Sequence, residues 1–235
     1  MQNSLQNKYS GLNELINLEE MRNYNEFIVC QSLKHKKHPK KIVDFGAGIG
    51  TLSIIFREKF KITPICIEID DVNKQYLNRR KLHVFESLDE VSEKSDLIFS
   101  SNVLEHIEDD LSILRKMKNN LNDTGLIYLY LPAKMSLWSE LDEIVGHYRR
   151  YAIREIREKC ESCGLKIVAA HYADSAGFLA SLLMKLLGYN SNNGIGSVSS
   201  LKFYDKWLFP ISKIMDSIGF KHLFGKNLIL IAKKL

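Results

Sequence analysis

Features that would place a chain in a secreted or membrane-spanning class are scarce in this sequence. Only 4 of its 235 residues are cysteine. No apolar run approaches the ~20 residues that a membrane-spanning helix needs. Residues 1–17 are polar and lack the apolar stretch of a signal peptide. From these absences we expect a cytoplasmic protein with reduced thiols.

The cysteines also lack the spacing of a metal site. Cys160 and Cys163 form a single C-x-x-C pair, with no second pair of cysteines or histidines at zinc-binding distance. Cys30 and Cys66 lie in apolar surroundings, which is typical of buried free thiols. The sequence therefore predicts neither a metal site nor a redox centre.

Charge of one sign is not concentrated either. The net charge is +5, and the only dense basic run spans residues 34–41, which is more typical of a helix end and linker than of a nucleic-acid-binding arm. Charged residues make up 26% and hydrophobic residues 45% of the chain, as in globular proteins. We expect one domain with an elaboration and no nucleic-acid partner.

The most informative stretch runs from residue 41 to residue 51. Ile42, Val43 and Phe45 predict a short buried strand, which three glycines interrupt before a helix over Leu52–Lys59. A strand that passes through glycines into a helix is typical of a nucleotide-binding turn. The glycines let a ligand approach the backbone, and the helix N-terminus offers free N–H groups.

Two residues bear on which nucleotide this turn binds. Thr51 stands where the dinucleotide fingerprint has its third glycine, and Asp44 would repel a pyrophosphate but attract an ammonium group. The stretch from Val43 to Gly50 resembles motif I of the class I S-adenosylmethionine methyltransferases. The resemblance implies that the methionine end of this cofactor contacts Asp44, Gly46, Ala47, Gly48 and Gly50.

The next two strands predict contacts with the rest of the cofactor. Glu68 ends a strand over Thr63–Glu68, at a distance from Gly50 where an acid accepts hydrogen bonds from ribose hydroxyls. Asp70 then predicts the N-cap of a helix reaching about Arg80. The resemblance adds Ile69, and, after a short third strand over Leu82–Phe85, it implies that Ser87 and Leu88 lie beside the adenine.

A second strong stretch runs from Asp96 to Asp110. It predicts a strand ending near Ser101 and closely resembles the N-x-L-E-H segment of the same methyltransferases. Asn102 and Val103 are then expected beside the sulfur of the cofactor. His106 is expected either on the acceptor side or as a packing histidine, and Glu105 in a structural role.

A third stretch follows a predicted fifth strand over Gly125–Leu131, which Pro132 ends. Residues 131–151 resemble the L-P-A … G-H-x-R-R-Y segment of a bacterial subgroup associated with cell-surface glycan or lipid pathways. Its acceptor-side candidates are His147, Tyr148, Arg149 and Arg150. Arginines can hold a carboxylate or phosphate, and His147 or a tyrosine can take a proton. The alternative is an internal clasp that pairs the arginines with Asp142 or Glu143.

The two ends of the chain predict helices around this core. Apolar residues at helical spacing between 12 and 33 indicate one or two helices, on which Tyr24 either closes over the cofactor or helps to cap the sheet. Helices over Ala176–Leu187 and Phe203–Ile218, with a kink at Pro210, flank a loop over Asn190–Ser200 and precede a closing strand over Asn227–Ala232. We expect them to pack on the domain over the acceptor pocket rather than to rest on a membrane surface.

Together these patterns predict a single Rossmann-like α/β domain over residues 1–235. Its parts are a helical cap (1–40), a core (41–172), a helical insertion (173–225) and a closing strand (226–235), which the resemblance places antiparallel in a mostly parallel seven-stranded sheet. The expected activity is S-adenosylmethionine-dependent methylation of a small-molecule, glycan or lipid-linked acceptor at oxygen. The alternatives are a non-catalytic cofactor-binding regulatory subunit and a nicotinamide-dependent oxidoreductase, which Asp44 and Thr51 disfavour.

Overall fold

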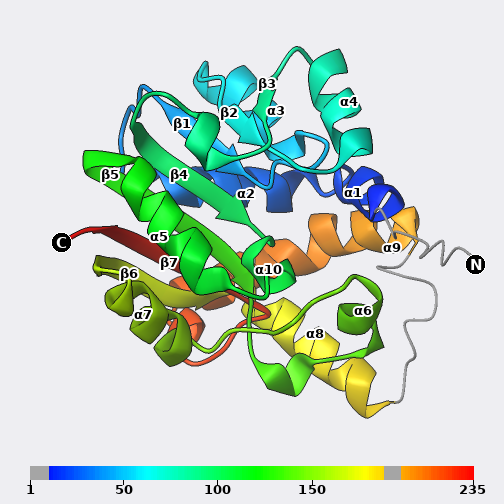
Figure 1. Cartoon of the computed structure of the whole chain (residues 1–235). Helices are drawn as coiled ribbons and strands as arrows, with labels where there is room; N and C mark the ends of the chain where they lie inside the picture. The colour runs from blue at the N-terminus through cyan, green and yellow to red at the C-terminus, as the bar shows by residue number, and fades with distance from the viewer. Residues whose placement is uncertain (1–10, 188–196) are drawn as a thin grey trace, which may run out of the picture.

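The computed structural model describes residues 11–187 and 197–235 of the chain. Within them a seven-stranded sheet has the order β3-β2-β1-β4-β5-β7-β6 (Figure 1). Strands β1 to β5 pair in parallel, whereas β7 runs antiparallel to both β5 and β6. The strands are β1 (Ile42–Phe45), β2 (Ile65–Ile67), β3 (His83–Phe85), β4 (Ser95–Ser101), β5 (Leu121–Pro132), β6 (Leu165–Ala173) and β7 (Asn227–Lys234). This arrangement confirms the expected fold class.

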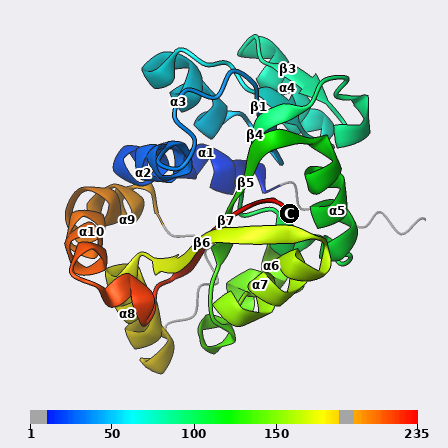
Figure 2. The same ribbon diagram turned by 90° about the vertical axis from the view of Figure 1, so that its left-hand side faces the viewer.

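Helices cover both faces of the sheet, as Figure 2 shows from the side. On one face α2 (Arg22–Leu33) and α3 (Thr51–Phe60) pack through Ile28, Val29 and Phe56. On the other face α5 (Asp110–Asn120) and α7 (Ile153–Ser162) pack through Leu114, Met117, Ile156 and Cys160. Because both faces are covered, central strands such as β5 are continuously apolar rather than alternating.

Strand β5 begins earlier than the sequence predicts. It starts at Leu121, which pairs with Ser95, and its register then shifts before Leu97 pairs with Leu126. We expected the strand to begin at Gly125, but residues 121–124 already belong to it and contain this irregularity. Gly125 is required there, because a Cβ at this position would lie 2.7 Å from the backbone oxygen of Ser95.

The remaining core helices follow the predicted positions closely. Two helices precede the first strand, namely α1 (Leu12–Leu18) and α2. The side chain of Asp70 accepts hydrogen bonds from the backbone N–H groups of Val72 and Asn73, so it caps α4 (Asp71–Arg79) as expected. All four cysteines are free thiols; Cys66 is buried as expected, whereas Cys30 on α2 is only partly buried.

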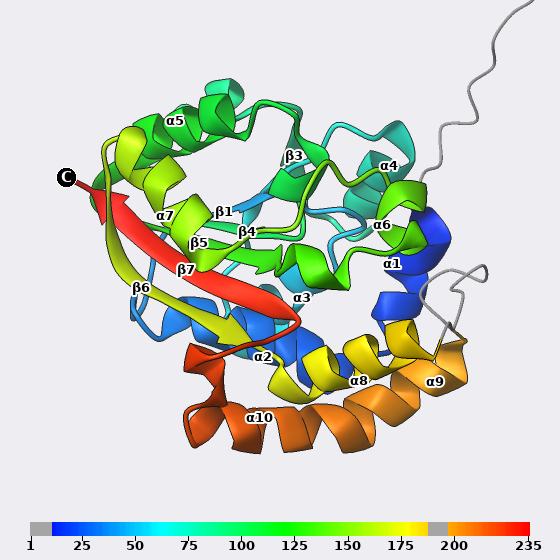
Figure 3. The ribbon, with the colours of Figure 1, turned by 90° about the horizontal axis from the view of Figure 1, so that it is seen from below.

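The chain between β6 and β7 forms the expected helical insertion, which lies beside α2 in Figure 3. Its elements are α8 (Ser175–Leu186), α9 (Val198–Phe203), the π-helical turn η4 (Tyr204–Leu208), α10 (Phe209–Ser217) and the 3-10 turn η5 (Phe220–His222). The expected kink at Pro210 corresponds to the junction of η4 and α10. Of the expected loop, residues 190–196 lie outside the described residues. Residues 198–200 are helical instead, because the Ser197 side chain accepts from the Ser200 N–H and starts α9.

A buried polar network joins the helices of the insertion. The Asp174 carboxylate accepts hydrogen bonds from the Gly177 N–H at 3.0 Å and from the Ser212 hydroxyl at 2.8 Å. The Asp216 carboxylate accepts from the backbone N–H of Asp174 at 2.9 Å and from the Ser175 hydroxyl. These polar contacts hold α8 against α10. Large apolar side chains of both helices, among them Leu183 and Ile214, are exposed. Among the described residues, no helix is both long enough and apolar enough to cross a bilayer.

Candidate active site

The glycine turn lies at the carboxyl edge of the sheet, between β1 and α3. The N–H groups of Gly46 and Ala47 both donate to the Ile67 carbonyl, at 2.8 and 3.0 Å, which ties the turn to β2. Gly46, Gly48 and Gly50 all have positive φ values, of 76°, 54° and 88°, a region that glycine enters without strain. A Cβ on Gly46 would lie 2.3 Å from a methyl carbon of Val103. The turn is therefore a bare backbone cradle.

Asp44, at the end of β1, is buried and accepts a hydrogen bond from the Ser53 hydroxyl at 2.7 Å. Burial raises the pKa of its carboxyl to about 7, the Ser53 hydrogen bond opposes this, and the nearby Glu68 carboxylate adds to it. It forms no ion pair with any described residue. This environment suits a site that receives a positive group such as the ammonium of the expected cofactor.

Glu68 follows β2 and faces the same turn. One carboxylate oxygen accepts from the Gly48 N–H at 2.7 Å, and the other accepts from the N–H groups of Ile69 and Asp70, both at 2.9 Å. The carboxylate thus lies against the glycine turn, where a ribose could replace the Gly48 N–H as a donor. Together with the bare backbone cradle, this position fits the methionine and ribose parts of the cofactor.

Helix α1 covers the turn, which the sequence patterns did not reveal. A methyl carbon of Leu15 lies 3.3 Å from where a Cβ of Gly48 would be. The Glu19 carboxylate, just beyond α1, accepts from the Thr51 hydroxyl at 2.8 Å and pairs with Arg80 at 2.6 Å. Arg80 and Thr51 belong to the ends of α4 and α3, so one acid fastens the N-terminal segment across the cofactor edge.

The side chains expected around the adenine differ in their exposure. Ile69 is 78% exposed beside Glu68 and offers an apolar surface to a flat base. Ser87 caps the 3-10 turn η1 (Leu88–Glu90), and the Leu88 side chain is buried in the core, which leaves only its backbone to face a ligand. The Tyr24 hydroxyl accepts hydrogen bonds from the Tyr130 hydroxyl at 3.1 Å and from the Asn227 amide at 3.0 Å. Tyr24 therefore lies within the packing between α2 and the sheet.

Beyond β4, Asn102 and Val103 lead into the 3-10 turn η2 (Leu104–His106). Asn102 has a positive φ of 53°, and its N–H donates to the Tyr130 carbonyl at 2.8 Å. This strained backbone turns the chain sharply at the strand end. Val103 packs against Gly46, so the structure brings these two expected cofactor residues next to the glycine turn.

Two histidines meet immediately after this turn. The rings of His106 and His147 lie 4.6 Å apart in an edge-to-face arrangement. Nδ1 of His147 is 2.7 Å from Asp142, and Nε2 is 3.9 Å from the carboxylate of Glu105. Partial burial and the neighbouring His147 lower the pKa of His106 to about 4, against weaker opposing contributions from the backbone of Gly146 and Val145. His106 is therefore neutral at physiological pH.

Glu105 was expected to be structural, but its carboxylate has no partner. It is fully buried, and neither of its oxygens accepts a hydrogen bond from a described residue. Burial raises its pKa to about 8, against opposing contributions from its own backbone N–H and from Arg150, and with a reinforcing one from Asp142. The N-x-L-E-H pattern drew attention to His106, yet the adjacent glutamate is the more unusual group in the folded chain.

The adjacent arginines make internal contacts. Arg150 forms a two-point pair with Asp142, through Nε at 2.8 Å and Nη2 at 3.0 Å. Arg149 pairs with Asp110 at 2.8 Å and donates to the Glu108 carbonyl at 2.8 Å. Tyr148, by contrast, is 55% exposed. These contacts correspond to the clasp alternative for the arginines, and their acceptor-facing role stays a prediction.

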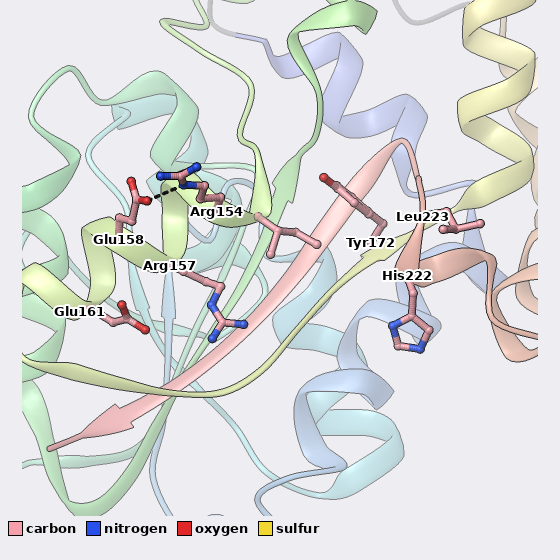
Figure 4. A pocket seen from close by; sticks show the side chains of 8 residues that line it. Arg154, Arg157, Glu158, Glu161, Tyr172, His222 and Leu223 are labelled. Carbon is pink, nitrogen blue, oxygen red and sulfur yellow. Dashed lines mark hydrogen bonds and ion pairs between the residues drawn. The ribbon is translucent and has the colours of Figure 1, made fainter.

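A surface depression lies elsewhere. It has a volume of about 630 Å³ and lies between α7 and the end of β6, close to η5 (Figure 4). Arg154 and Glu158 on its rim pair with each other at 2.8 Å. None of the residues that line it belongs to the glycine turn or to the histidine pair, so we assign it no part in the site.

Comparison with known proteins identifies a family. A family profile described as "Methyltransferase domain" matches residues 18–170, which is more than half of the chain. No curated protein matches the chain.

Solved structures share the fold at low identity. An S-adenosylmethionine-dependent methyltransferase from Archaeoglobus fulgidus is 18% identical with a TM-score of 0.60, and the match covers 94% of this chain and 99% of that one. A putative methyltransferase of Haloferax volcanii, solved in complex with the Trm112 activator, is 12% identical with a TM-score of 0.65 and 99% coverage of both chains. An O-methyltransferase of a Brevibacillus brevis polyketide multienzyme, bound to S-adenosylhomocysteine, is 18% identical with a TM-score of 0.57, covering 96% of this chain and 79% of that one.

Proposed function

This chain belongs to the methyltransferase-domain family and uses S-adenosylmethionine, and we propose that it methylates an oxygen of a small-molecule, glycan or lipid-linked acceptor. Family membership removes the nicotinamide-dependent alternative. The proposal about the acceptor rests on one observation above all, which is the contact between the imidazoles of His106 and His147; His106 follows β4, three residues after Val103, which packs against Gly46. The bacterial subgroup suggested by the G-H-Y-R-R-Y segment is part of the same proposal.

The cofactor would be held by the groups already described at the carboxyl edge of the sheet. We assign its ammonium to the neighbourhood of Asp44, its ribose to Glu68, and its sulfur side to Asn102 and Val103. When bound, S-adenosylmethionine supplies a methyl group with its own leaving group, so the chain need not create an electrophile. Its remaining tasks are to align an acceptor atom and to manage a proton.

The histidine pair suits the proton task. A hydroxyl that gains a methyl group must lose its proton, and a neutral imidazole accepts it on an unprotonated ring nitrogen. Asp142 accepts from Nδ1–H of His147, which leaves the Nε2 lone pair facing the interior beside His106. The resulting imidazolium is stabilised by Asp142, whose negative charge is retained because its pKa is low. An oxygen acceptor needs such a base more than an amine does.

The proposal is tested with radiolabelled S-adenosylmethionine and fractionated lysate, followed by mass spectrometry of labelled products. We expect one labelled class, with the mass of an O-methyl ether or ester. His147→Gln should reduce its formation about 100-fold, the lower end of what general base catalysis contributes, while cofactor affinity stays unchanged. His83→Gln, which replaces an exposed histidine on β3, is the matched control. Cofactor binding without any labelled product, or full activity of His147→Gln, would contradict the proposal.

A further inference from the structure

Three side chains with metal-binding atoms converge at the end of β4. They are Glu105, His106 and His147, and one ligand atom from each lies within 4.8 Å of the other two. Ligands that share a first-row metal lie about 2 Å from it, so they are at most ~4 Å apart. The 3.9 Å between Nε2 of His147 and the Glu105 carboxylate is just within this limit, and the three groups must move closer together to share one ion.

The unpaired carboxylate of Glu105 independently indicates a missing cation. A buried carboxylate is costly unless hydrogen bonds or a positive group compensate it. The neighbouring buried acids have such partners: Asp142 binds Arg150 and His147, and Asp110 binds Lys159 and Tyr151. Neither oxygen of Glu105 has a hydrogen-bond partner among the described residues, and Nε2 of His147 lies 3.9 Å away.

His147 is already oriented as a ligand. Metal-bound histidines almost always donate their second ring N–H to a carboxylate or carbonyl, which fixes the tautomer and makes the ligating nitrogen more basic. Asp142 provides this contact at Nδ1, and Arg150 and the Ser139 N–H hold Asp142 in turn. Nε2 is therefore directed at Glu105 and His106 with its lone pair available.

We propose that Glu105, His106 and His147 bind one divalent first-row transition metal ion. Two imidazoles and one carboxylate favour Zn²⁺, Co²⁺, Mn²⁺ or Fe²⁺ over Mg²⁺ and Ca²⁺. The sequence predicted no metal site because these ligands are neither cysteines nor a C-x-x-C or H-x-x-x-H pattern; 40 residues separate His106 from His147. His106 is exposed, so positions on the ion remain open towards the acceptor side.

The ion would also bind the acceptor oxygen, and this part of the inference rests on the proposed O-methylation. In the metal-bound form the imidazole lone pairs are engaged with the ion, so the ion takes over the proton task assigned above to His147. A bound hydroxyl has a lowered pKa and loses its proton to water. The remaining oxygen lone pair is the one that receives the methyl group, so charge and protons balance without a further reagent. An acceptor with two adjacent oxygens would occupy two open positions.

The site is tested by metal titration of chelator-treated protein in the presence of a thiol reductant. We expect one Co²⁺ per chain with visible d–d absorption, and one Zn²⁺ by calorimetry. Glu105→Gln and His147→Gln should each weaken binding at least 100-fold, and Asp142→Asn about tenfold, the scale of outer-shell partners. His83→Gln should bind like the wild type. Absence of stoichiometric binding, or unchanged binding in both ligand variants, overturns the site.

The chelator-treated and metal-loaded proteins also allow metal binding and methyl transfer to be tested separately. Cofactor affinity is measured with and without Zn²⁺, and methyl transfer is measured before and after chelation. We expect chelation to reduce turnover and readdition to restore it, with cofactor affinity little changed. Undiminished turnover after chelation refutes the role of the metal in transfer. If no acceptor is methylated under either condition, the proposed function fails, and the titration still decides the metal site.

A second observation concerns the outer face of the helical insertion. Along α9, η4 and α10, large apolar side chains recur every three or four residues and are exposed; they are Phe203, Trp207, Ile211, Ile214 and Ile218. We name them the apolar stripe. Lys202, Lys206 and Lys213 each directly precede a member of the stripe, so they lie along one flank of it. Lys202 pairs with Glu20 at 3.0 Å, so the basic character of this flank rests on Lys206 and Lys213. Leu179, Leu183 and Leu186 of the adjoining α8 are also exposed, the last at 76%.

From this pattern we infer that the apolar stripe rests on an anionic lipid surface. Helices with an apolar face and a basic flank bury the face at the boundary between head groups and acyl chains. The inner face of the insertion packs on the domain as expected, through Phe209 and the polar network of Asp174 and Asp216. The outer face, which we did not expect to contact lipid, carries the charge that complements anionic phosphates. A lipid-linked acceptor would then be methylated at the surface.

Vesicle sedimentation tests this inference. The protein should co-sediment with vesicles of phosphatidylglycerol and phosphatidylcholine, less with phosphatidylcholine alone, and dissociate as salt rises. Trp207→Ser combined with Ile214→Ser should abolish binding, and Lys206→Gln with Lys213→Gln should weaken it about 25-fold, from roughly fivefold per lysine. Val168→Ser, which removes an exposed apolar side chain from β6, is the control.

Three outcomes overturn the inference. One is the absence of binding to anionic vesicles at low salt, and another is binding that the stripe variants leave unchanged. The third is a stable dimer in sedimentation velocity that the Trp207→Ser, Ile214→Ser variant converts to monomer, since a second copy would then cover the stripe.

Discussion

Removal of the Arg150 side chain should destabilise the fold severely. Asp142 is 1% exposed and accepts from Nε and Nη2 of Arg150 at 2.8 and 3.0 Å. Although burial acts to raise its pKa, the hydrogen bonds from His147 and Arg150 lower it to about 2. Arg150→Ala leaves this carboxylate buried with only His147 and Ser139 as partners. Breaking a buried pair costs roughly 3–5 kcal/mol, and the retained partners favour the lower end.

Thermal unfolding at pH 7.5 measures the effect. A loss of about 3 kcal/mol corresponds to a fall in Tm of roughly 6–12 °C for a domain of this size. The control is Arg154→Ala, which removes an exposed pair with Glu158 and should leave Tm unchanged. Arg149→Ala should lie between the two, because Lys159 and Tyr151 remain on Asp110.

The effect of Arg150→Ala on Tm should depend on pH with a definite sign. A carboxyl with a lowered folded-state pKa stabilises the fold above its unfolded value of about 4, and this contribution is lost as pH falls towards 2. The difference in Tm between wild type and Arg150→Ala should therefore narrow below pH 4. If Arg150→Ala melts like Arg154→Ala at pH 7.5 but loses turnover, the guanidinium faces the acceptor and the clasp is refuted.

Three further predictions concern the cofactor edge. Asp44 has a raised pKa, so its ionisation destabilises the fold as pH rises from about 4 through 7. Asp44→Asn should therefore raise Tm more at pH 8 than at pH 4. The same substitution should weaken cofactor binding measured by calorimetry. Gly48→Val should abolish binding, because a side chain at φ 54° would strain the turn and meet Leu15; a wild-type Kd would remove the turn from the site. Glu68→Ala should weaken binding by roughly 1–3 kcal/mol, the scale of hydrogen bonds to a charged acceptor, and unchanged affinity would contradict the ribose contact.

Local sequence patterns predicted the elements whose cause is local. The glycine turn follows from three glycines at alternate positions, and the cap of α4 follows from Asp70, whose oxygen reaches N–H groups two and three residues later. The antiparallel position of β7 between β5 and β6 has no such local cause. It was expected from the family resemblance, because the apolar pattern over 227–232 indicates a strand but not its neighbours.

Long-range contacts account for what the sequence missed. The pairing of Arg150 with an acid eight residues earlier was foreseen as one of two choices, since both belong to one loop. Arg149 instead pairs with Asp110, at the start of α5, which no spacing rule connects to it. The contact of Leu15 with Gly48 likewise depends on how α1 crosses the sheet edge.

Two buried carboxylates identify where positive charge is missing. Asp44 and Glu105 lie at the ends of adjacent strands, β1 and β4, and burial raises the pKa of both. Neither pairs with a described lysine or arginine, and Nε2 of His147 lies no closer than 3.9 Å to Glu105. Each buried carboxylate therefore lowers the stability of the fold relative to an amide of the same shape. In our proposals a cation offsets this loss of stability at each site, the ammonium group of the cofactor at Asp44 and a metal ion at Glu105. Each ligand should therefore stabilise the wild type against heat, and Asp44→Asn and Glu105→Gln should each lose only the stabilisation by its own cation.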